Sequence, residues 1–236
     1  YPASMKPYLM GKYFEEFPGG KSVLYNYLDP DCIFTQPMDF KPFYTEENVW
    51  FGSGTKSYTG EKYIKSKGIQ LFYDLCDIVG LSPALIEGRT GWEVGAQYFI
   101  KNNTPELWFE IENKSIDIYE YALKTKDIYH PEGHKSLQAW CAEMYATQMV
   151  AIKNGIDLKV SPLMEFMWAS HNINNWNKIP YYHNAGQLKD NGKDFFKSGF
   201  KTSPFKKEIN ISQLSASYKY LQLVRKTEET FPDLIW

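Results

Sequence analysis

The sequence contains few cysteines, and none of them form a pair with metal-ligand spacing. Its three cysteines, Cys32, Cys76 and Cys141, lie far apart in a chain of 236 residues. An odd, unclustered set argues against a disulfide framework and indicates reduced thiols in an intracellular protein. We therefore expect a cytoplasmic location.

Long apolar runs and an excess of one charge are also absent. No apolar run approaches the roughly 20 residues that a membrane helix needs, so we expect no membrane span. The net charge of −2 gives no overall basic field that would draw the chain to nucleic acid. Aromatic residues, in contrast, are abundant at 17% and favour a carbohydrate or nucleotide ligand, because rings stack on sugars and bases.

Strands alternate with helices along the chain, without a repeat or an interdomain linker. The patterns predict strands at 22–28, 95–100, 158–160 and 180–182, a short strand starting near 48, and helices at 4–17, 67–79, 105–123, 137–155 and 212–229. Such alternation predicts an α/β fold in which helices cover a mainly parallel central sheet. We expect a single domain over residues 1–236.

The segment Asp29-Pro30-Asp31 follows the first predicted strand, whose apolar run indicates burial on both faces. Residues i and i+2 share one face of a strand, so both carboxylates can reach one hard cation such as Mg²⁺ or Mn²⁺. The other interpretation is a solvated turn, since Asp-Pro-Asp is also good turn chemistry.

A histidine and several lysines far downstream could complete such a site. His183 ends a short strand before Asn184-Ala185-Gly186, and an imidazole beside two carboxylates favours Mn²⁺ over Mg²⁺. Lysines in the aromatic loop after it, Lys197 and Lys201 among them, suit a diphosphate. A structural histidine and a solvated basic loop are the alternatives.

Glu143 lies on a helix among bulky apolar residues. Partial burial would raise the pKa of its carboxyl and suit it to act as a general base. A position on the solvent-facing side of the helix is the alternative.

Together these features resemble the GT-A class of nucleotide-sugar glycosyltransferases, in which an Asp-x-Asp motif precedes a late histidine. The stretches 50–58, 95–98 and 183–186 look like uncharacterised glycosyltransferase-like proteins of tailed bacteriophages, and the similarity covers residues 8–205. The resemblance implies a GT-A-like, Rossmann-related domain that transfers a sugar from a nucleotide-diphosphate donor to an acceptor hydroxyl. The acceptor it suggests is a modified DNA base or a glycan.

The resemblance also assigns roles to residues. Asp31 and His183 would bind the Mn²⁺ (or Mg²⁺), Asp29 would face the metal or the donor ribose, and Lys197 or Lys201 would contact the diphosphate. Gly95, Ala96 and Gln97 would lie beneath the donor sugar, and Glu143 would meet the acceptor hydroxyl.

One departure and two rival functions accompany this hypothesis. Only 28 residues precede Asp29, so the strand that binds the nucleotide base in this class is expected to be missing from a chain that begins at Tyr1. The first rival is another metal-dependent enzyme on phosphorylated substrates, such as a nucleotidyltransferase or phosphohydrolase. The second is a non-catalytic sugar-binding or virion-associated module.

Overall fold

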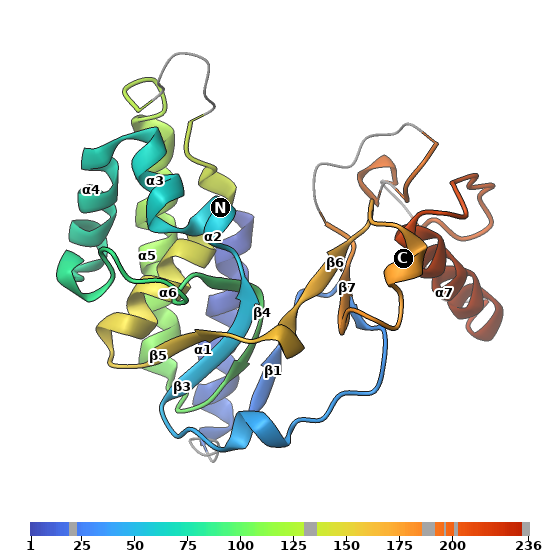
Figure 1. Cartoon of the computed structure of the whole chain (residues 1–236), viewed down its shortest axis with the longest axis horizontal. Coiled ribbons are helices and arrows are strands. Elements are labelled where there is room, and N and C mark those ends of the chain that lie inside the picture. The colour runs from blue at the N-terminus through green and yellow to red at the C-terminus, as the bar shows by residue number, and fades with distance from the viewer. Residues whose placement is uncertain (19–22, 130–135, 186–191, 196, 201–202, 233–236) are drawn as a thin grey trace. The chain divides into compact units, whose positions relative to one another are not determined.

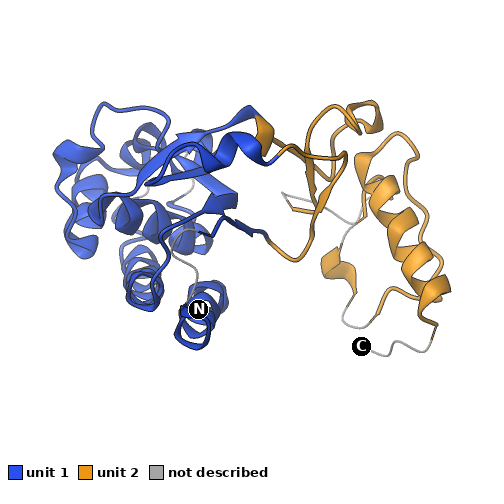
Figure 2. Ribbon diagram, turned by 90° about the horizontal axis from the view of Figure 1, so that it is seen from below, with its two compact units in different colours: residues 1–28, 40–162 blue, residues 29–39, 163–236 orange. Residues whose placement is uncertain are grey.

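The structure is a computed structural model that describes residues 1–18, 23–129, 136–185, 192–195, 197–200 and 203–232. The chain folds into two compact units, which are coloured separately in Figure 2. Unit 1 comprises Tyr1–Leu28 and Phe40–Pro162, and unit 2 comprises Asp29–Asp39 and Leu163–Trp236. The expectation of one domain over residues 1–236 stays a prediction.

Unit 1 contains a four-stranded sheet with the order β1-β4-β3-β5. Its strands are β1 (Tyr25–Tyr27), β3 (Val49–Gly54), β4 (Val94–Ile100) and β5 (Asp157–Val160) (Figure 1). β4 pairs antiparallel with β1 and with β3, whereas β3 and β5 are parallel. Every residue of β4 is buried, so this strand lies in the core of the unit.

The α-helices of unit 1 begin and end at recognisable signals. They are α1 (Met5–Glu16), α2 (Lys56–Thr59), α3 (Glu61–Lys67), α4 (Ile69–Val79), α5 (Pro105–Lys124) and α6 (Ala142–Lys153). The Thr104 side chain caps the Leu107 N–H of α5, and Pro105 occupies the first turn of that helix. α4 ends at Gly80, whose φ of 74° is the left-handed conformation that terminates many helices. α5 packs against both α1 and α6.

Unit 2 is built on a three-stranded sheet with the order β2-β7-β6. The strands are β2 (Cys32–Phe34), β6 (Phe166–Trp168) and β7 (Tyr181–His183), and one helix, α7 (Ala216–Thr230), follows them. β2 and β7 are antiparallel, and β6 and β7 are parallel. Met167, Ala169, Tyr182 and Ala216 form a small buried cluster in this unit.

Short 3₁₀ turns connect these elements. They lie at Pro2–Ser4, Lys41–Tyr44, Pro83–Leu85, Ala139–Cys141, Pro162–Met164, Ile173–Asn175 and Lys197–Gly199. No helix in the described part of the chain is long and apolar enough to cross a membrane.

The prediction of a mainly parallel, Rossmann-related GT-A sheet is wrong. The structure has two small mixed sheets, of four and three strands, in which most pairs are antiparallel. The parallel sheet is predicted from the alternation of strands and helices, and the connection from β3 to β4 does contain helices, namely α2, α3 and α4. A helical connection permits a parallel return but does not require it, and β4 returns antiparallel to β3.

The strand predicted over 22–28 is also much shorter than expected. Within its described residues only Tyr25–Tyr27 form a strand, and only Tyr27 in it is buried. β1 has β4 as its partner at one edge of the sheet, and Val23 just before it is 45% exposed. The tyrosine-rich run therefore marks a half-covered edge strand and not a central one.

Candidate metal centre

The two aspartates of the Asp-x-Asp segment lie in a tight turn that leads into β2. The Cys32 N–H donates to the Asp29 carbonyl oxygen at 3.0 Å, which closes this turn around Pro30. Their position is therefore a turn between β1 and β2 rather than the end of a strand, but it is not the solvated turn of the alternative interpretation, because the Asp31 side chain is only 14% exposed. The turn nevertheless directs both carboxylates toward one imidazole.

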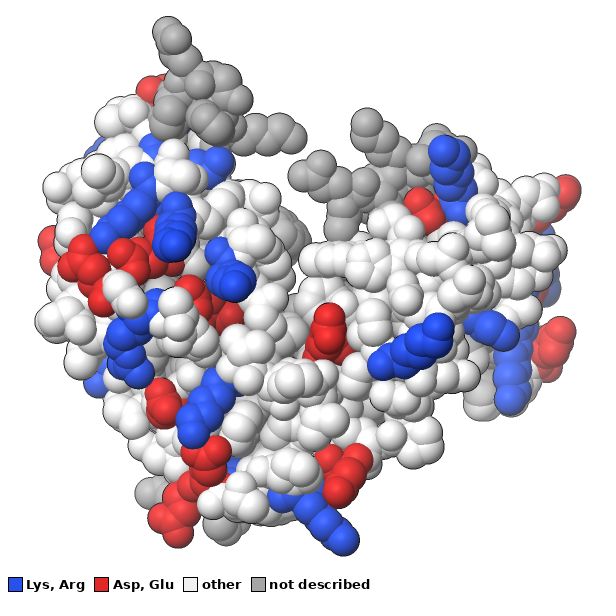
Figure 3. Space-filling view, in the orientation of Figure 1, with Lys and Arg blue, Asp and Glu red and all other residues white. Residues whose placement is uncertain are grey.

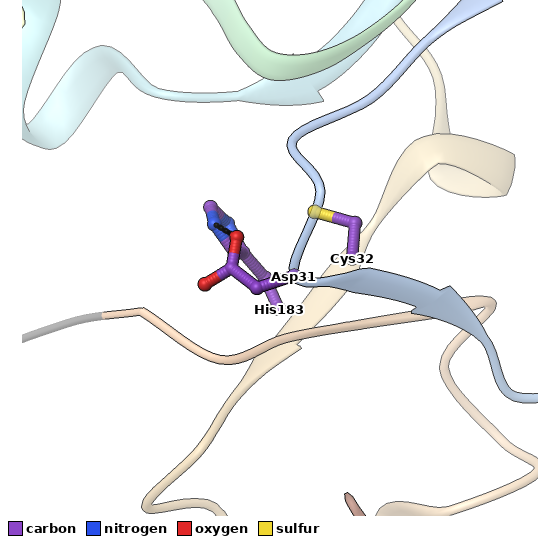
Figure 4. A group of neighbouring side chains, drawn as sticks. All are labelled: Asp31, Cys32 and His183. Atoms are coloured by element: carbon purple, nitrogen blue, oxygen red, sulfur yellow. Dashed lines mark ion pairs between the residues drawn. The ribbon is translucent and has the colours of Figure 1, made fainter. Parts of the chain in front are cut away.

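That imidazole belongs to His183 on the neighbouring strand. In the antiparallel β2–β7 pair Cys32 lies directly opposite His183, and the Asn184 N–H donates to the Asp31 carbonyl oxygen at 3.1 Å. The start of β2 and the end of β7 are thus held together, so residues more than 150 positions apart in sequence share one site. Figure 4 shows Asp31 and His183 side by side, with the Cys32 sulfur directed toward them.

The contacts at this point are close and largely shielded from water. His183 Nε2 lies 3.3 Å from Asp29 Oδ2 and 3.3 Å from Asp31 Oδ1. The His183 side chain is only 7% exposed, and that of Asp31 is 14% exposed. Lys197 adds a second positive charge by pairing with the other oxygen of Asp31.

Aromatic residues of β6 hold the imidazole ring in place. Trp168 lies opposite His183 in the parallel β6–β7 register, and its ring stacks on the imidazole at 6.2 Å with an interplanar angle of 16°. The ring of Phe166, also on β6, has its centroid 5.5 Å from that of the His183 imidazole. This packing fixes the ring orientation with Nε2 facing the carboxylates.

The pKa values follow from burial and from these contacts. Burial lowers the pKa of His183, but hydrogen bonds to Asp29, Asp31 and Cys32 outweigh it and raise that pKa to about 11. Burial raises the pKa of Asp31, but hydrogen bonds from His183 and Lys197 hold it below its ordinary value. In the absence of a metal ion the group is therefore a network of opposite charges.

The same residues have the chemistry of a metal site. Asp31, Cys32 and His183 each offer one ligand atom, and these atoms all lie within 4.8 Å of one another. His183 Nδ1 is buried and has no hydrogen-bond partner among the described residues, so the ring nitrogen that carries the polar contacts is Nε2. Carboxylate oxygens with an imidazole nitrogen are suitable ligands for Mn²⁺ or Zn²⁺, so the donor set fits a divalent ion.

The structure describes only one of the two lysines that were predicted to contact the diphosphate. Lys197 lies at the cluster, where it pairs with Asp31, and Lys201 lies outside the described residues. Lys197 also lines a cavity of about 230 Å³ in unit 2, together with Phe195, Phe200, Pro204, Tyr220 and Val224. An aromatic-lined space therefore adjoins the lysine that holds Asp31.

The residues predicted to lie beneath the donor sugar belong to unit 1. Gly95, Ala96 and Gln97 lie in the buried strand β4, where Ala96 has a positive φ of 62°. β3 shifts its register against β4 between Gly52 and Ser53, so the ladder is irregular at this point. Their proposed role toward a donor sugar stays a prediction, since they and the carboxylate cluster belong to different units.

Glu143 also belongs to unit 1, and its alternative position on a solvent-facing side of the helix is wrong. The residue is 3% exposed and lies in the first turn of α6. Its carboxylate lies 3.3 Å from the Lys6 ammonium, and it accepts from the hydroxyls of Tyr27 at 3.4 Å and Thr147 at 3.3 Å. The burial that a general base would need is present, but the catalytic role stays a prediction.

Sequence reasoning missed Cys32 and the two aromatic residues of β6 that pack against His183, Phe166 and Trp168. Cys32 directly follows Asp31, but the sequence does not reveal that β2 pairs with β7 and brings its thiol opposite His183. The segment 166–168 contains only three strand residues, too few for a periodic signal.

Comparison with known proteins adds no assignment. A scan against protein-family models, a search of curated proteins and a search of solved structures each found no match.

Proposed function

We propose that this protein is a metal-dependent glycosyltransferase that moves a sugar from a nucleotide-diphosphate donor to an acceptor hydroxyl. In this proposal Asp29, Asp31 and His183 hold the divalent ion, for which the resemblance implies Mn²⁺ or Mg²⁺. The observation that carries it is the position of His183 Nε2, 3.3 Å from carboxylate oxygens of both aspartates. The choice of a sugar as the transferred group rests on the resemblance of the motifs to GT-A enzymes.

The arrangement of unit 2 suits the departure of a diphosphate. A bound divalent ion would supply Lewis-acid stabilisation of the negative charge that develops on the leaving group. Lys197 has a half-exposed side chain, so its ammonium can exchange its contact with Asp31 for a phosphate oxygen. The aromatic cavity next to Lys197 offers room for a ring of the donor.

The acceptor in this proposal is a hydroxyl group on a glycan or on a modified DNA base. Lysine and arginine side chains are interspersed with aspartate and glutamate on the face shown in Figure 3, which favours a small or glycan acceptor over an extended phosphate backbone. Glu143 is proposed to act on that hydroxyl as a base. Its buried carboxylate has Lys6 as its cationic partner.

Metal-dependent stabilisation of the full chain tests the metal site. Mn²⁺ should raise the melting temperature of the wild-type protein, and Asp31→Asn should abolish that rise because it removes a ligand charge. Glu229→Gln, which changes an exposed carboxylate on α7, should respond to Mn²⁺ as the wild type does. An equal response of Asp31→Asn and wild type would exclude Asp31 as a ligand.

Nucleotide-sugar donors then test the reaction class. We expect UDP- or GDP-sugars to add a further stabilisation only when Mn²⁺ is present, and the free nucleoside diphosphate to appear when an acceptor is supplied. Release of pyrophosphate or phosphate without a transferred sugar would identify a nucleotidyltransferase or phosphohydrolase instead. Donor binding that is unaffected by Mn²⁺ and by Asp31→Asn would identify a non-catalytic sugar-binding module.

A further inference from the structure

Cys32 differs from the other two cysteines in its surroundings. Cys76 and Cys141 belong to the hydrophobic core of unit 1. Cys32 is also buried, at 8% exposure, but its sulfur and ligand atoms of Asp31 and His183 all lie within 4.8 Å of one another. Cys32 therefore lies in a polar and charged environment, whereas a cysteine that serves only for packing is surrounded by apolar side chains.

The backbone fixes this position. Cys32 and His183 are opposite one another in the β2–β7 register, and side chains that are directly opposite in an antiparallel pair have Cβ atoms about 4.5–5.5 Å apart. Asp31 is the preceding residue and is held to β7 through the Asn184 N–H. The three groups therefore stay together without any need for a loop to close over them.

We propose that Cys32 binds the metal ion as a thiolate, together with Asp31 and His183, and that the site consequently selects Zn²⁺ or Co²⁺ over Mg²⁺. This inference rests on the proposed function insofar as it assumes a metal ion at the same site. On binding, the thiol releases its proton to the solvent and the sulfur forms the bond to the ion. A sulfur ligand favours a borderline ion such as Zn²⁺, whereas Mg²⁺ requires oxygen ligands.

The distances allow this coordination after a small adjustment. The ligand atoms lie within 4.8 Å of one another, and ligands of a tetrahedral zinc ion are about 3.5 Å apart, given Zn–N and Zn–S bonds of about 2.1 and 2.3 Å. Side-chain rotations that move each ligand atom by on the order of 1 Å would bring the separations of up to 4.8 Å to the spacing of a zinc site. A substrate oxygen in the fourth position would give the arrangement of a catalytic zinc site, whereas Asp29 in that position would close the site.

Cobalt spectroscopy on the full chain tests the thiolate bond directly. Co²⁺ added to the wild-type protein should give visible bands of a bound ion and an intense thiolate-to-cobalt charge-transfer band in the near ultraviolet. Cys32→Ser should lose the charge-transfer band and bind Zn²⁺ about tenfold or more weakly. The matched controls Cys76→Ser and Cys141→Ser should retain both the band and the affinity.

The outcomes separate this inference from the proposed metal site. Visible cobalt bands that require Asp31 and His183, without a charge-transfer band in the wild type, would overturn the role of Cys32 and leave the metal site in place. No cobalt or zinc binding at all would overturn both. If Cys32→Ser does not fold, the charge-transfer band of the wild type decides the matter, because that band requires a thiolate ligand and its survival in Cys76→Ser and Cys141→Ser leaves Cys32 as its source.

Discussion

Asp74 on α4 illustrates how a single carboxylate stabilises unit 1. Its Oδ2 atom accepts hydrogen bonds from the hydroxyls of Tyr121 at 2.5 Å and Tyr129 at 2.7 Å, and Gln70 donates to Oδ1 at 2.9 Å. Burial raises the pKa of Asp74, but these three donors outweigh it and hold the pKa below its ordinary value. The carboxylate thereby ties α4 to α5 and to the segment that follows α5.

The pH dependence of this contribution has a definite sign. Because the folded pKa of Asp74 lies below the unfolded value, the stabilisation is complete above about pH 4 and disappears as the pH falls through the folded pKa. Asp74→Asn should lower the free energy of unfolding by about 1–2 kcal/mol at pH 7, and by less as the pH falls through the folded pKa toward pH 2. Urea unfolding at both pH values measures the difference.

A control on the same helix isolates the effect. Asp77→Asn changes an exposed carboxylate of α4 and should leave this pH-dependent difference near zero. The same loss at pH 2 as at pH 7 in Asp74→Asn would show that packing, and not the charge, accounts for it.

The residues of the candidate metal centre show how much of a site can be predicted from the sequence at the residue scale. Asp29, Asp31 and His183 were recognisable because metal ligands belong to few residue types, and the structure brings the three together. Cys32 was not recognisable, because a buried cysteine is usually an apolar packing residue. Only the β2–β7 register distinguishes it from Cys76.

At the scale of elements, the helices were more predictable than the strands. The helix predicted over 105–123 spans Pro105–Lys124, and the one predicted over 67–79 corresponds to α4 with the end of α3. Caps and a 3.6-residue period are local signals, so a single segment contains them. β2, β6 and β7 have three residues each, and their existence depends on partners far away in the sequence.

The start of α5 gives a prediction at this scale. Thr104 has an extended backbone conformation, and its hydroxyl oxygen accepts from the Leu107 N–H at 3.2 Å. Thr104→Ala leaves that donor without its cap and should reduce the free energy of unfolding by about 1 kcal/mol. Thr104→Ser keeps an oxygen at the same place and should remain within a few tenths of a kcal/mol of the wild type.

Chemical denaturation monitored by far-ultraviolet circular dichroism measures both variants. α5 is the longest helix among the described residues and packs against α1 and α6, so its loss would be visible in the signal. Equal destabilisation by alanine and serine would contradict the capping role and indicate that the threonine methyl group provides the contact.

At the scale of the whole molecule, the order of the chain explains why the sheet topology was not foreseen. In unit 2, β2 belongs to residues 29–39 and the other strands lie after residue 162. Residues 40–162, which lie between these two parts in the sequence, belong to unit 1. The strand-helix alternation is a local pattern and contains no information on which distant strands pair. The prediction of a mainly parallel sheet rests on that alternation alone.

The division of the chain into two units predicts which residues a bound metal ion would protect from hydrogen exchange. All the proposed ligands, Asp29, Asp31, Cys32 and His183, belong to unit 2. Binding to the native state lowers the population of opened states, so at a free ion concentration 100 times the dissociation constant amide exchange through opening of the site should slow roughly 100-fold. We expect this slowing in β2, β6 and β7, and no comparable change in α4, α5 and α6 of unit 1.

Hydrogen exchange measured by mass spectrometry, with and without Zn²⁺ or Mn²⁺, tests this expectation. Peptides covering residues 29–39 and 166–185 report on the site, and peptides covering 105–124 report on unit 1. Asp31→Asn should remove the protection, and Glu229→Gln should retain it, because only the former changes a ligand. Protection that extends equally over both units would contradict a site contained within unit 2 and would mean that the ion stabilises the chain as one cooperative structure.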